Sequence, residues 1–140
     1  MIHAYDLEMC QTVWRDRKSH GAGVTAIMLR ENDNTLLTGS YDDILRVFDS
    51  RTRRIVTELE MGGGVWRLDN QGNNSVVVSC MYAGAAVVDL GEGGRSPSIA
   101  KKFEEHESMN YGCSIHPSDL NTVVSCSFYD KRLCIWNINS

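Results

Sequence analysis

The sequence predicts an all-β fold made of short antiparallel strands in about three repeated units. Apolar, β-branched runs alternate with clusters of turn residues along the 140 residues. Tyr41, Tyr82 and Tyr129 each follow such a run, at intervals of 41 and 47 residues. No convincing helical stripe competes with these strands. A hydrophobic fraction of 42% with 23% charged residues is enough to build a core.

Composition also narrows the functional classes. The net charge is −4, and the longest basic run is "RTRR" at Arg51–Arg54, which argues against a general nucleic-acid binder. No apolar run is long enough for a membrane span, and "MIHAYDLEMC" does not resemble a signal peptide. We therefore expect a cytoplasmic protein. Five cysteines without a C-x-x-C motif are interpreted as reduced core thiols, with no metal site or cofactor predicted.

The best-defined unit contains four predicted strands. The predicted strands are Val24–Leu29, Thr35–Gly39, Leu45–Phe48 and Ile55–Leu59. Glu31–Asn34, a run of turn-forming residues, separates the first strand from the second. We name the strands of a unit a, b, c and d in chain order. Lys101–Glu107 occupies the position of an outer strand and loop in a later unit.

Each unit closes its third strand with an aromatic or aliphatic residue followed by Asp or Asn, as in Tyr5-Asp6, Phe48-Asp49, Val88-Asp89 and Trp136-Asn137. A period near 40–45 with such a dipeptide is typical of a WD40 blade of a β-propeller. The predicted segments are residues 1–22, 23–63, 64–109 and 110–140, the first and last incomplete. Propellers close with 4–8 blades, so we expect further N-terminal blades of the same propeller.

WD40 blades are stabilised by a hydrogen-bonded set of His, Ser or Thr, Asp and Trp. In the second segment these positions hold His20, Thr38 and Asp42, with Phe48 replacing Trp. We expect His20 and Asp42 to lie within hydrogen-bonding reach, or one residue removed. A structural role is favoured over acid–base catalysis.

The last segment offers a second set. It contains His106, Asp130 and Trp136, with Cys126 aligned to the strand-b position. The same proximity is expected for His106 and Asp130, and a structural role is again favoured.

The middle segment lacks this set. Its d–a loop, "EMGGGVWR", has no His, and its b–c turn, "MYAG", has no Asp. Gly62–Gly64 precede Trp66 and Arg67, and glycines permit close approach of another backbone or of a ligand. The alternative is a plain flexible loop with Trp66 in the core. Because a surface loop tolerates change better than a core strand, Gly63→Val is expected to impair folding less than function.

In an antiparallel meander the b–c turns and d–a loops share one end. We therefore expect Tyr41, Tyr82 and Tyr129 to lie on one aromatic, partly acidic face, together with Gly62–Gly64. Such a face suits a quaternary ammonium group or a basic partner. It is equally typical of the protein-binding rim of a propeller.

Several strings are more specific than the repeat. "TGSYDDILRVFDSR", "GGGVWRL", "SCMYAG" and "SCSFYDKRLCIW" resemble the WD-repeat diphthine methylesterase family, also called diphthine methyltransferase. The resemblance covers the C-terminal half of the family's propeller. It implies hydrolysis of the methyl ester of methylated diphthine on elongation factor 2, the partner and substrate, during diphthamide biosynthesis. The rival interpretation is a non-catalytic WD40 scaffold.

Ester hydrolysis needs a nucleophile or activated water and donors for the oxyanion. The sequence has no G-x-S-x-G motif, and Cys80 and Cys126 are interpreted as buried, so a base-activated water is predicted. His106 or Asp130 is the candidate base. Gly62, Gly63 and Gly64, with Arg67, are candidate oxyanion donors, and Trp66, Tyr82 and Tyr129 are candidate ligands of the trimethylammonium group.

Overall fold

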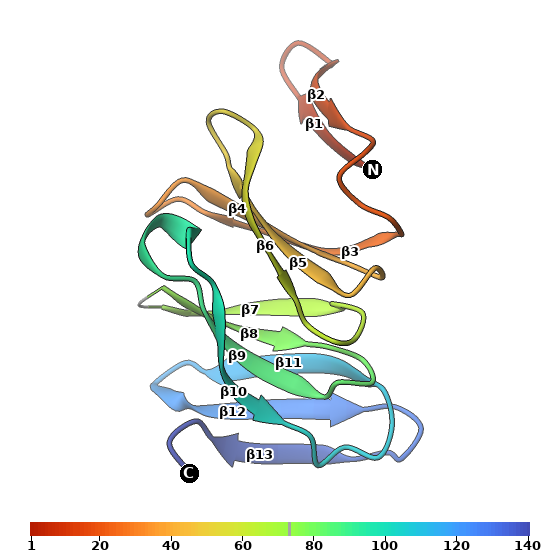
Figure 1. The fold of residues 1–140 in the computed structure, drawn as a ribbon, viewed down its shortest axis with the longest axis vertical. Helices are drawn as coiled ribbons and strands as arrows, with labels where there is room; N and C mark the ends of the chain where they lie inside the picture. The colour runs from red at the N-terminus through yellow and green to blue at the C-terminus, as the bar shows by residue number, and fades with distance from the viewer. Residues whose placement is uncertain (73) are drawn as a thin grey trace.

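The computed structural model describes residues 1–72 and 74–140, which form four antiparallel sheets stacked in chain order (Figure 1). In Figure 1 the N-terminal hairpin is at the top and the C-terminal sheet is at the bottom. The all-β prediction is confirmed. Within the part of the chain that the structure describes, no helix has the length and apolar character needed to cross a membrane.

The first sheet is a hairpin of β1 (Ile2–Asp6) and β2 (Gln11–Asp16). The second sheet contains, in order, β3 (Val24–Arg30), β4 (Thr35–Ser40), β5 (Ile44–Asp49) and β6 (Arg54–Glu60). All four strands predicted for this unit lie inside the observed strands, which extend them by at most one residue at either end.

The third sheet contains β7 (Arg67–Gly72), β8 (Ser75–Ser79), β9 (Ala85–Asp89) and β10 (Ser98–Phe103), with the short 3-10 turn η1 (Glu92–Gly94) before β10. The fourth contains β11 (Asn110–His116), β12 (Asp119–Ser127) and β13 (Leu133–Asn137). Each sheet is a simple meander in which every strand pairs with its chain neighbour.

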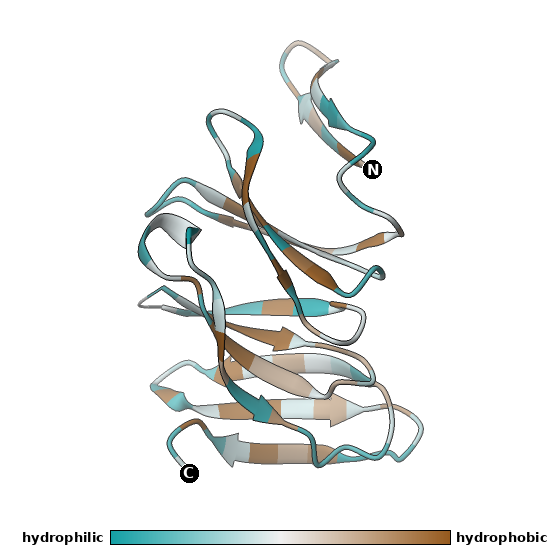
Figure 2. Ribbon diagram, viewed as in Figure 1, coloured by the Kyte–Doolittle hydropathy of each residue, from teal (hydrophilic) through white to brown (hydrophobic). Residues whose placement is uncertain are grey.

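The core lies between sheets, and the third sheet is buried on both faces. Val76 and Val78 of β8 join Leu37 and Leu45 in a cluster against the second sheet, whereas Val77 joins a separate cluster against the fourth. Figure 2 shows the corresponding hydrophobic colouring along β8 and β9. A strand buried on both faces is expected to be apolar at consecutive positions rather than alternating, which explains the "VVV" run.

The first strands of neighbouring sheets lie side by side, because β7 contacts both β3 and β11. Asp69 of β7 joins two of these strands. Its carboxylate accepts hydrogen bonds from the Ser114 hydroxyl at 2.8 Å and from the Ile115 amide at 2.9 Å, both on β11. The third and fourth sheets are therefore held together by polar contacts as well as by the apolar core.

Candidate aromatic site at the end of the propeller

The fourth sheet contains a complete hydrogen-bonded set. Nε2 of His106 lies 2.8 Å from the Ser125 hydroxyl, which also accepts a hydrogen bond from Nε1 of Trp136 at 3.1 Å. Nδ1 of His106 lies 2.8 Å from the Ser127 hydroxyl, and that hydroxyl donates to Asp130. One residue, Ser127, thus bridges His106 and Asp130, and the predicted proximity of the two is confirmed. We call these five residues the polar lock.

The polar lock leaves little freedom for proton transfer. Burial lowers the pKa of His106, although Asp130 opposes that shift. The Ser127 hydroxyl lowers the pKa of Asp130 to about 2, with further help from the Glu107 amide. Both ring nitrogens of His106 are already hydrogen-bonded, and a carboxylate of such low pKa is a weak base.

The second sheet contains a partial version of the polar lock. Nε2 of His20 lies 2.9 Å from the Thr38 hydroxyl, and the His20 ring stacks on Phe48 with centroids 6.1 Å apart. Asp42 accepts a hydrogen bond from the amide of Gly21, the neighbour of His20, at 2.7 Å. The second predicted proximity is therefore also confirmed. Phe48 has no donor for Thr38, and buried Nδ1 of His20 has no hydrogen-bond partner among the described residues.

Arg46 supplies the missing connection in this sheet. Its buried guanidinium pairs with Asp42 at 2.9 Å and with Glu58 at 2.7 Å. Burial raises the pKa of Asp42, but hydrogen bonds from Arg46 and Gly21 outweigh it and hold that pKa at about 2. An ion pair thus partly replaces the Trp–Ser contact of the fourth sheet.

One alignment made from the sequence was wrong. Ser125, not Cys126, occupies the strand-b position of the polar lock, because Ser125 pairs with Cys134 as Thr38 pairs with Arg46. The five cysteines were expected to be core thiols, but Cys10 and Cys126 are exposed. Cys80 is buried, as expected. Burial raises the pKa of the Cys80 thiol to about 12, which makes it a poor nucleophile. All five cysteines are free.

In the third sheet, apolar residues occupy the positions of the polar lock. Val78 aligns with Thr38 through its place in the β8–β9 ladder, and Val88 aligns with Trp136. Both are fully buried. The serine and tryptophan positions are therefore held by packing alone.

The three glycines pack against the b–c turn of their own sheet. A Cβ on Gly63 would overlap the carbonyl oxygen of Cys80 and lie 3.0 Å from the amide of Ala83. A Cβ on Gly64 would lie 2.6 Å from the sulfur of Met81. Gly63 and Gly64 are buried, whereas Gly62 is exposed. Close approach of the turn backbone explains Gly63, the Met81 side chain crowds Gly64, and Gly62 has a φ of 79°. The expectation that Gly63 lies in a surface loop is wrong, because this residue is buried.

Two inter-sheet contacts hold this turn in place. The buried side chains of Ser79 and Asn110 are hydrogen-bonded to each other, and the Asn110 amide donates to the Met81 carbonyl at 3.0 Å. The b–c turn of the third sheet is thus tied to the fourth sheet instead of to a histidine of its own.

A chain of aromatic rings crosses this end of the molecule. Trp66 lies edge-on to Tyr41 at 5.7 Å and to Tyr111 at 5.1 Å, measured between ring centroids. Tyr111 lies 6.4 Å from Phe128, which contacts Tyr129 at 5.2 Å. These residues come from the second, third and fourth sheets. With Tyr82, described next, we call them the aromatic cluster.

The aromatic cluster is open to solvent. Tyr41, Phe128 and Tyr129 are 50%, 69% and 64% exposed, and Tyr82 is 79% exposed. The pKa of Tyr111 is raised by partial desolvation and by the neighbouring tyrosines Tyr129, Tyr41 and Tyr82. Tyr82 lies near Tyr111 because the preceding residues of the two, Met81 and Asn110, pair with each other. The expectation that the turns and d–a loops share one aromatic face agrees with these contacts.

The structure brings some predicted site residues together and separates others. Trp66, Tyr82 and Tyr129 belong to the aromatic cluster, and exposed Arg67 lines a cavity together with Tyr111. His106 and Asp130 belong to the polar lock instead. Tyr111 and Phe128 were missed as site residues, because only the stacking of sheets places them beside Trp66.

Comparison with known proteins identifies the family. The family described as "WD domain, G-beta repeat" matches residues 10–49 and 98–137, more than half of the chain. The chain belongs to the WD40 family. The two matched stretches are those that contain His20 and His106. Within residues 1–72 and 74–140, no three His, Cys, Asp or Glu side chains are grouped as metal ligands would be.

Curated relatives are more specific than the repeat. The chain is 35% identical over 131 residues to "Diphthine methyltransferase" of Schizosaccharomyces pombe, covering 89% of this WD40 chain and 40% of the relative. It is 32% identical to the protein of that name in Saccharomyces cerevisiae, covering 96% and 42%. A "Diphthine methyltransferase homolog" of Dictyostelium discoideum is 30% identical. The resemblance seen in the sequence is confirmed, and the chain spans about two fifths of the first two relatives.

Solved structures support the fold. A computationally designed protein named Ika8 superposes with a TM-score of 0.70 at 22% identity, covering 86% of this WD40 chain and 35% of its own. A chain of the Mitotic Checkpoint Complex superposes with a TM-score of 0.79 at 14% identity, covering 95% and 41%. At these identities the likeness concerns the propeller architecture alone.

Proposed function

We propose that this chain is part of a protein that hydrolyses the methyl ester of methylated diphthine on elongation factor 2, releasing methanol and leaving a carboxylate. The names of the curated relatives support a role in diphthamide biosynthesis. The ester-hydrolysis step rests on the family resemblance described from the sequence.

The aromatic cluster is the observation that carries the proposal. The expected substrate contains a trimethylammonium group, and a quaternary ammonium is attracted to the faces of Trp and Tyr rings. Trp66 is central, because it contacts both Tyr41 and Tyr111. Tyr82 and Tyr129 lie at the exposed rim. In this proposal the cluster binds the ammonium group and so places the ester near Gly62 and Arg67.

The remaining candidate residues are of two kinds: exposed groups that a substrate can reach, and groups that are already hydrogen-bonded in the polar lock. Gly62 and Arg67 are exposed, and an amide together with a guanidinium are suitable donors for a developing oxyanion. His106 and Asp130 are assigned here to the polar lock, because their hydrogen-bonding groups are already used. The group that activates water is therefore proposed to lie outside this chain, in the rest of the propeller.

A mass-spectrometric assay tests the proposal. The longest natural form of the protein is incubated with methylated elongation factor 2, and the modified histidine peptide is monitored for loss of one methylene unit. Trp66→Leu should slow the reaction at least about tenfold, equivalent to roughly 1.4 kcal/mol. Tyr5→Leu, which removes an exposed tyrosine on β1 far from the cluster in sequence and sheet, is the matched control. Equal rates for the two variants would show that the aromatic cluster is not part of the substrate-binding site.

A non-catalytic scaffold is the second candidate. It is favoured by the engagement of His106 and Asp130 in the polar lock and by the exposed aromatic residues, which are common at protein-binding surfaces. If wild-type protein binds elongation factor 2 but produces no loss of mass at any enzyme concentration, the scaffold function is the correct one.

A further inference from the structure

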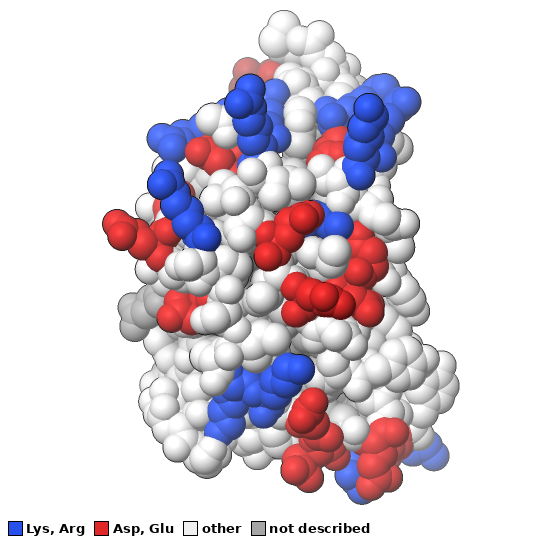
Figure 3. All heavy atoms as spheres, viewed as in Figure 1, with Lys and Arg blue, Asp and Glu red and all other residues white. Residues whose placement is uncertain are grey.

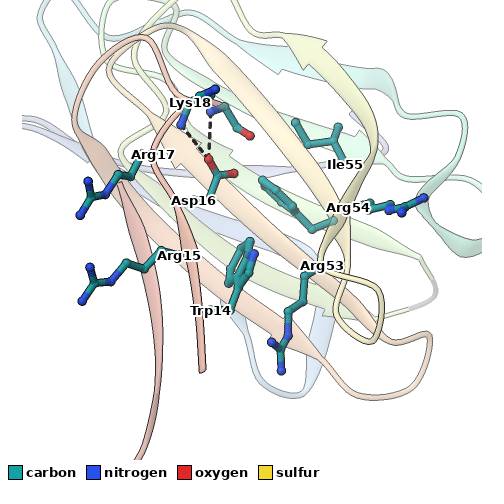
Figure 4. Close-up of a pocket in the computed structure, with 10 residues that line it drawn as sticks. Trp14, Arg15, Asp16, Arg17, Lys18, Arg53, Arg54 and Ile55 are labelled. Carbon is teal, nitrogen blue, oxygen red and sulfur yellow. Dashed lines mark hydrogen bonds between the residues drawn. The ribbon is translucent and has the colours of Figure 1, made fainter. Parts of the chain in front are cut away.

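A second cleft lies between β2 and the β5–β6 turn (Figure 4). Its apolar floor includes Trp14, Phe48 and Ile55. The ring of Trp14 lies edge-on to Phe48 with centroids 6.0 Å apart, which fixes the first sheet against the second. This cleft is separate from the aromatic cluster, with which it shares no residue.

Basic side chains surround this floor. Five of the fourteen Lys and Arg residues of the chain line the cleft: Arg15, Arg17, Lys18, Arg53 and Arg54. In Figure 4 Arg15 and Arg17 extend away from Trp14 on one side, while Arg53 and Arg54 extend from the opposite wall. Figure 3 shows Lys and Arg gathered toward the N-terminal end of the visible face.

These charges are not neutralised within the cleft. Its one acidic residue, Asp16, uses a carboxylate oxygen to accept the amides of Lys18 and Ser19, at 2.9 and 3.0 Å. None of the ion pairs found among residues 1–72 and 74–140 involves the five basic residues. The positive potential is therefore available to a partner.

Arg53 is held in an unusual conformation. Its φ of 59° is in the left-handed region, which favours glycine. Its guanidinium donates to the Val13 carbonyl at 2.9 Å and so connects the two walls of the cleft.

We propose that this cleft binds an acidic peptide segment of a protein partner, with one apolar side chain on the floor and its carboxylates on the basic rim. An apolar floor between two basic walls fits a peptide with alternating character. A long nucleic acid is disfavoured, because these five basic residues are confined to one cleft with an apolar floor and do not form the extended basic stripe that follows a phosphate backbone. The inference is independent of the proposed ester hydrolysis.

Fluorescence anisotropy with the longest natural form of the protein tests this proposal. The probe is a fluorescein-labelled peptide of about ten residues, Asp and Glu around a central Phe. The variant Arg17→Glu/Arg54→Glu should weaken binding at least about tenfold, and binding should fall as salt rises. The control Arg95→Glu/Lys102→Glu makes the same change in net charge at two exposed residues of the third sheet's c–d loop and β10. It should change affinity less than about twofold.

Three results would overturn the proposal: no measurable binding of the acidic peptide, equal losses in the two double variants, or tighter binding of a uridine decamer than of the peptide. The third would identify the cleft as a nucleic-acid site. Circular dichroism of each variant checks that the sheets are retained.

Discussion

The third and fourth sheets solve one packing problem in two ways. The fourth joins its loop, strand b and strand c through hydrogen bonds of His106, Ser125 and Trp136. The third places Val78 and Val88 in the same positions and closes its turn by backbone contact at Gly63. The difference shows that a blade can keep its shape without its polar residues when both faces of the sheet are buried.

The substitution also changes what the end of the blade can do. In the fourth sheet, the backbone amide of Glu107 in the d–a loop donates a hydrogen bond to Asp130 in the b–c turn, so the loop and the turn are joined to each other. In the third sheet the glycine loop packs inward, and Trp66, two residues after Gly64, contacts rings from both neighbouring sheets. The middle blade has thus exchanged a polar lock for an aromatic surface.

The largest expected effect comes from Gly63→Val. Its side chain would overlap the Cys80 carbonyl, so the third sheet should lose about 3 kcal/mol or more of unfolding free energy. Gly23→Val is the matched control, because a Cβ there meets no atom within 4 Å. Urea unfolding of the longest natural form measures both. A stable Gly63→Val protein would show that the glycine contact does not hold this blade together.

A reciprocal exchange sharpens the comparison. Ser125→Val leaves Nε2 of His106 and Nε1 of Trp136 each without a hydrogen-bond partner and should cost about 2 to 4 kcal/mol. Val78→Ser buries a hydroxyl where no histidine is available, and should cost about 1 to 3 kcal/mol. The urea midpoints of the two variants give these values. The comparison fails if either exchange leaves the midpoint unchanged.

A smaller effect is expected from pH. Burial lowers the pKa of His106 below 6.5, so the unfolded chain binds the proton more readily than the folded chain does. The stability this provides is present above about pH 6.5 and is lost as the pH falls below that value. Wild-type protein should therefore lose stability between pH 7 and 5, and His106→Asn should lose less over the same interval. Parallel pH profiles of the wild-type protein and His106→Asn would show that His106 is not the source of this pH dependence. His20, with its pKa lowered chiefly by burial, remains in the variant as an internal reference.

The strands and both polar sets could be predicted from the sequence because they depend on local patterns. Alternating runs bounded by turn residues placed β3 to β6, and the spacing of His and Asp placed each pair on a loop and a facing turn. The strand-b serine was missed because the segment joining Cys126 to Leu133 is one residue longer than that joining Gly39 to Leu45. Such an insertion moves an alignment by one residue without changing the strand pattern.

The aromatic cluster could be predicted only in part. Trp66 and the turn tyrosines are conspicuous in the sequence, but Tyr111 and Phe128 join them through the stacking of sheets. The burial of Gly63 was missed for the same reason, since "GGG" is equally compatible with an open loop and with a tight backbone contact. In both cases the deciding information is the distance between segments far apart in the chain.

The central claim is that the middle blade contributes an aromatic surface for a quaternary ammonium group. The most direct test is an NMR titration that follows the indole N–H of Trp66 with choline and with its uncharged isostere, 3,3-dimethylbutan-1-ol. We predict that choline shifts the Trp66 signal at concentrations about five- to tenfold lower than the isostere, because a cation–π contact contributes roughly 1 kcal/mol at an exposed site. The signals of Trp14 and Trp136 should not move. Equal responses to the two ligands, or a response at all three tryptophans, would contradict the account.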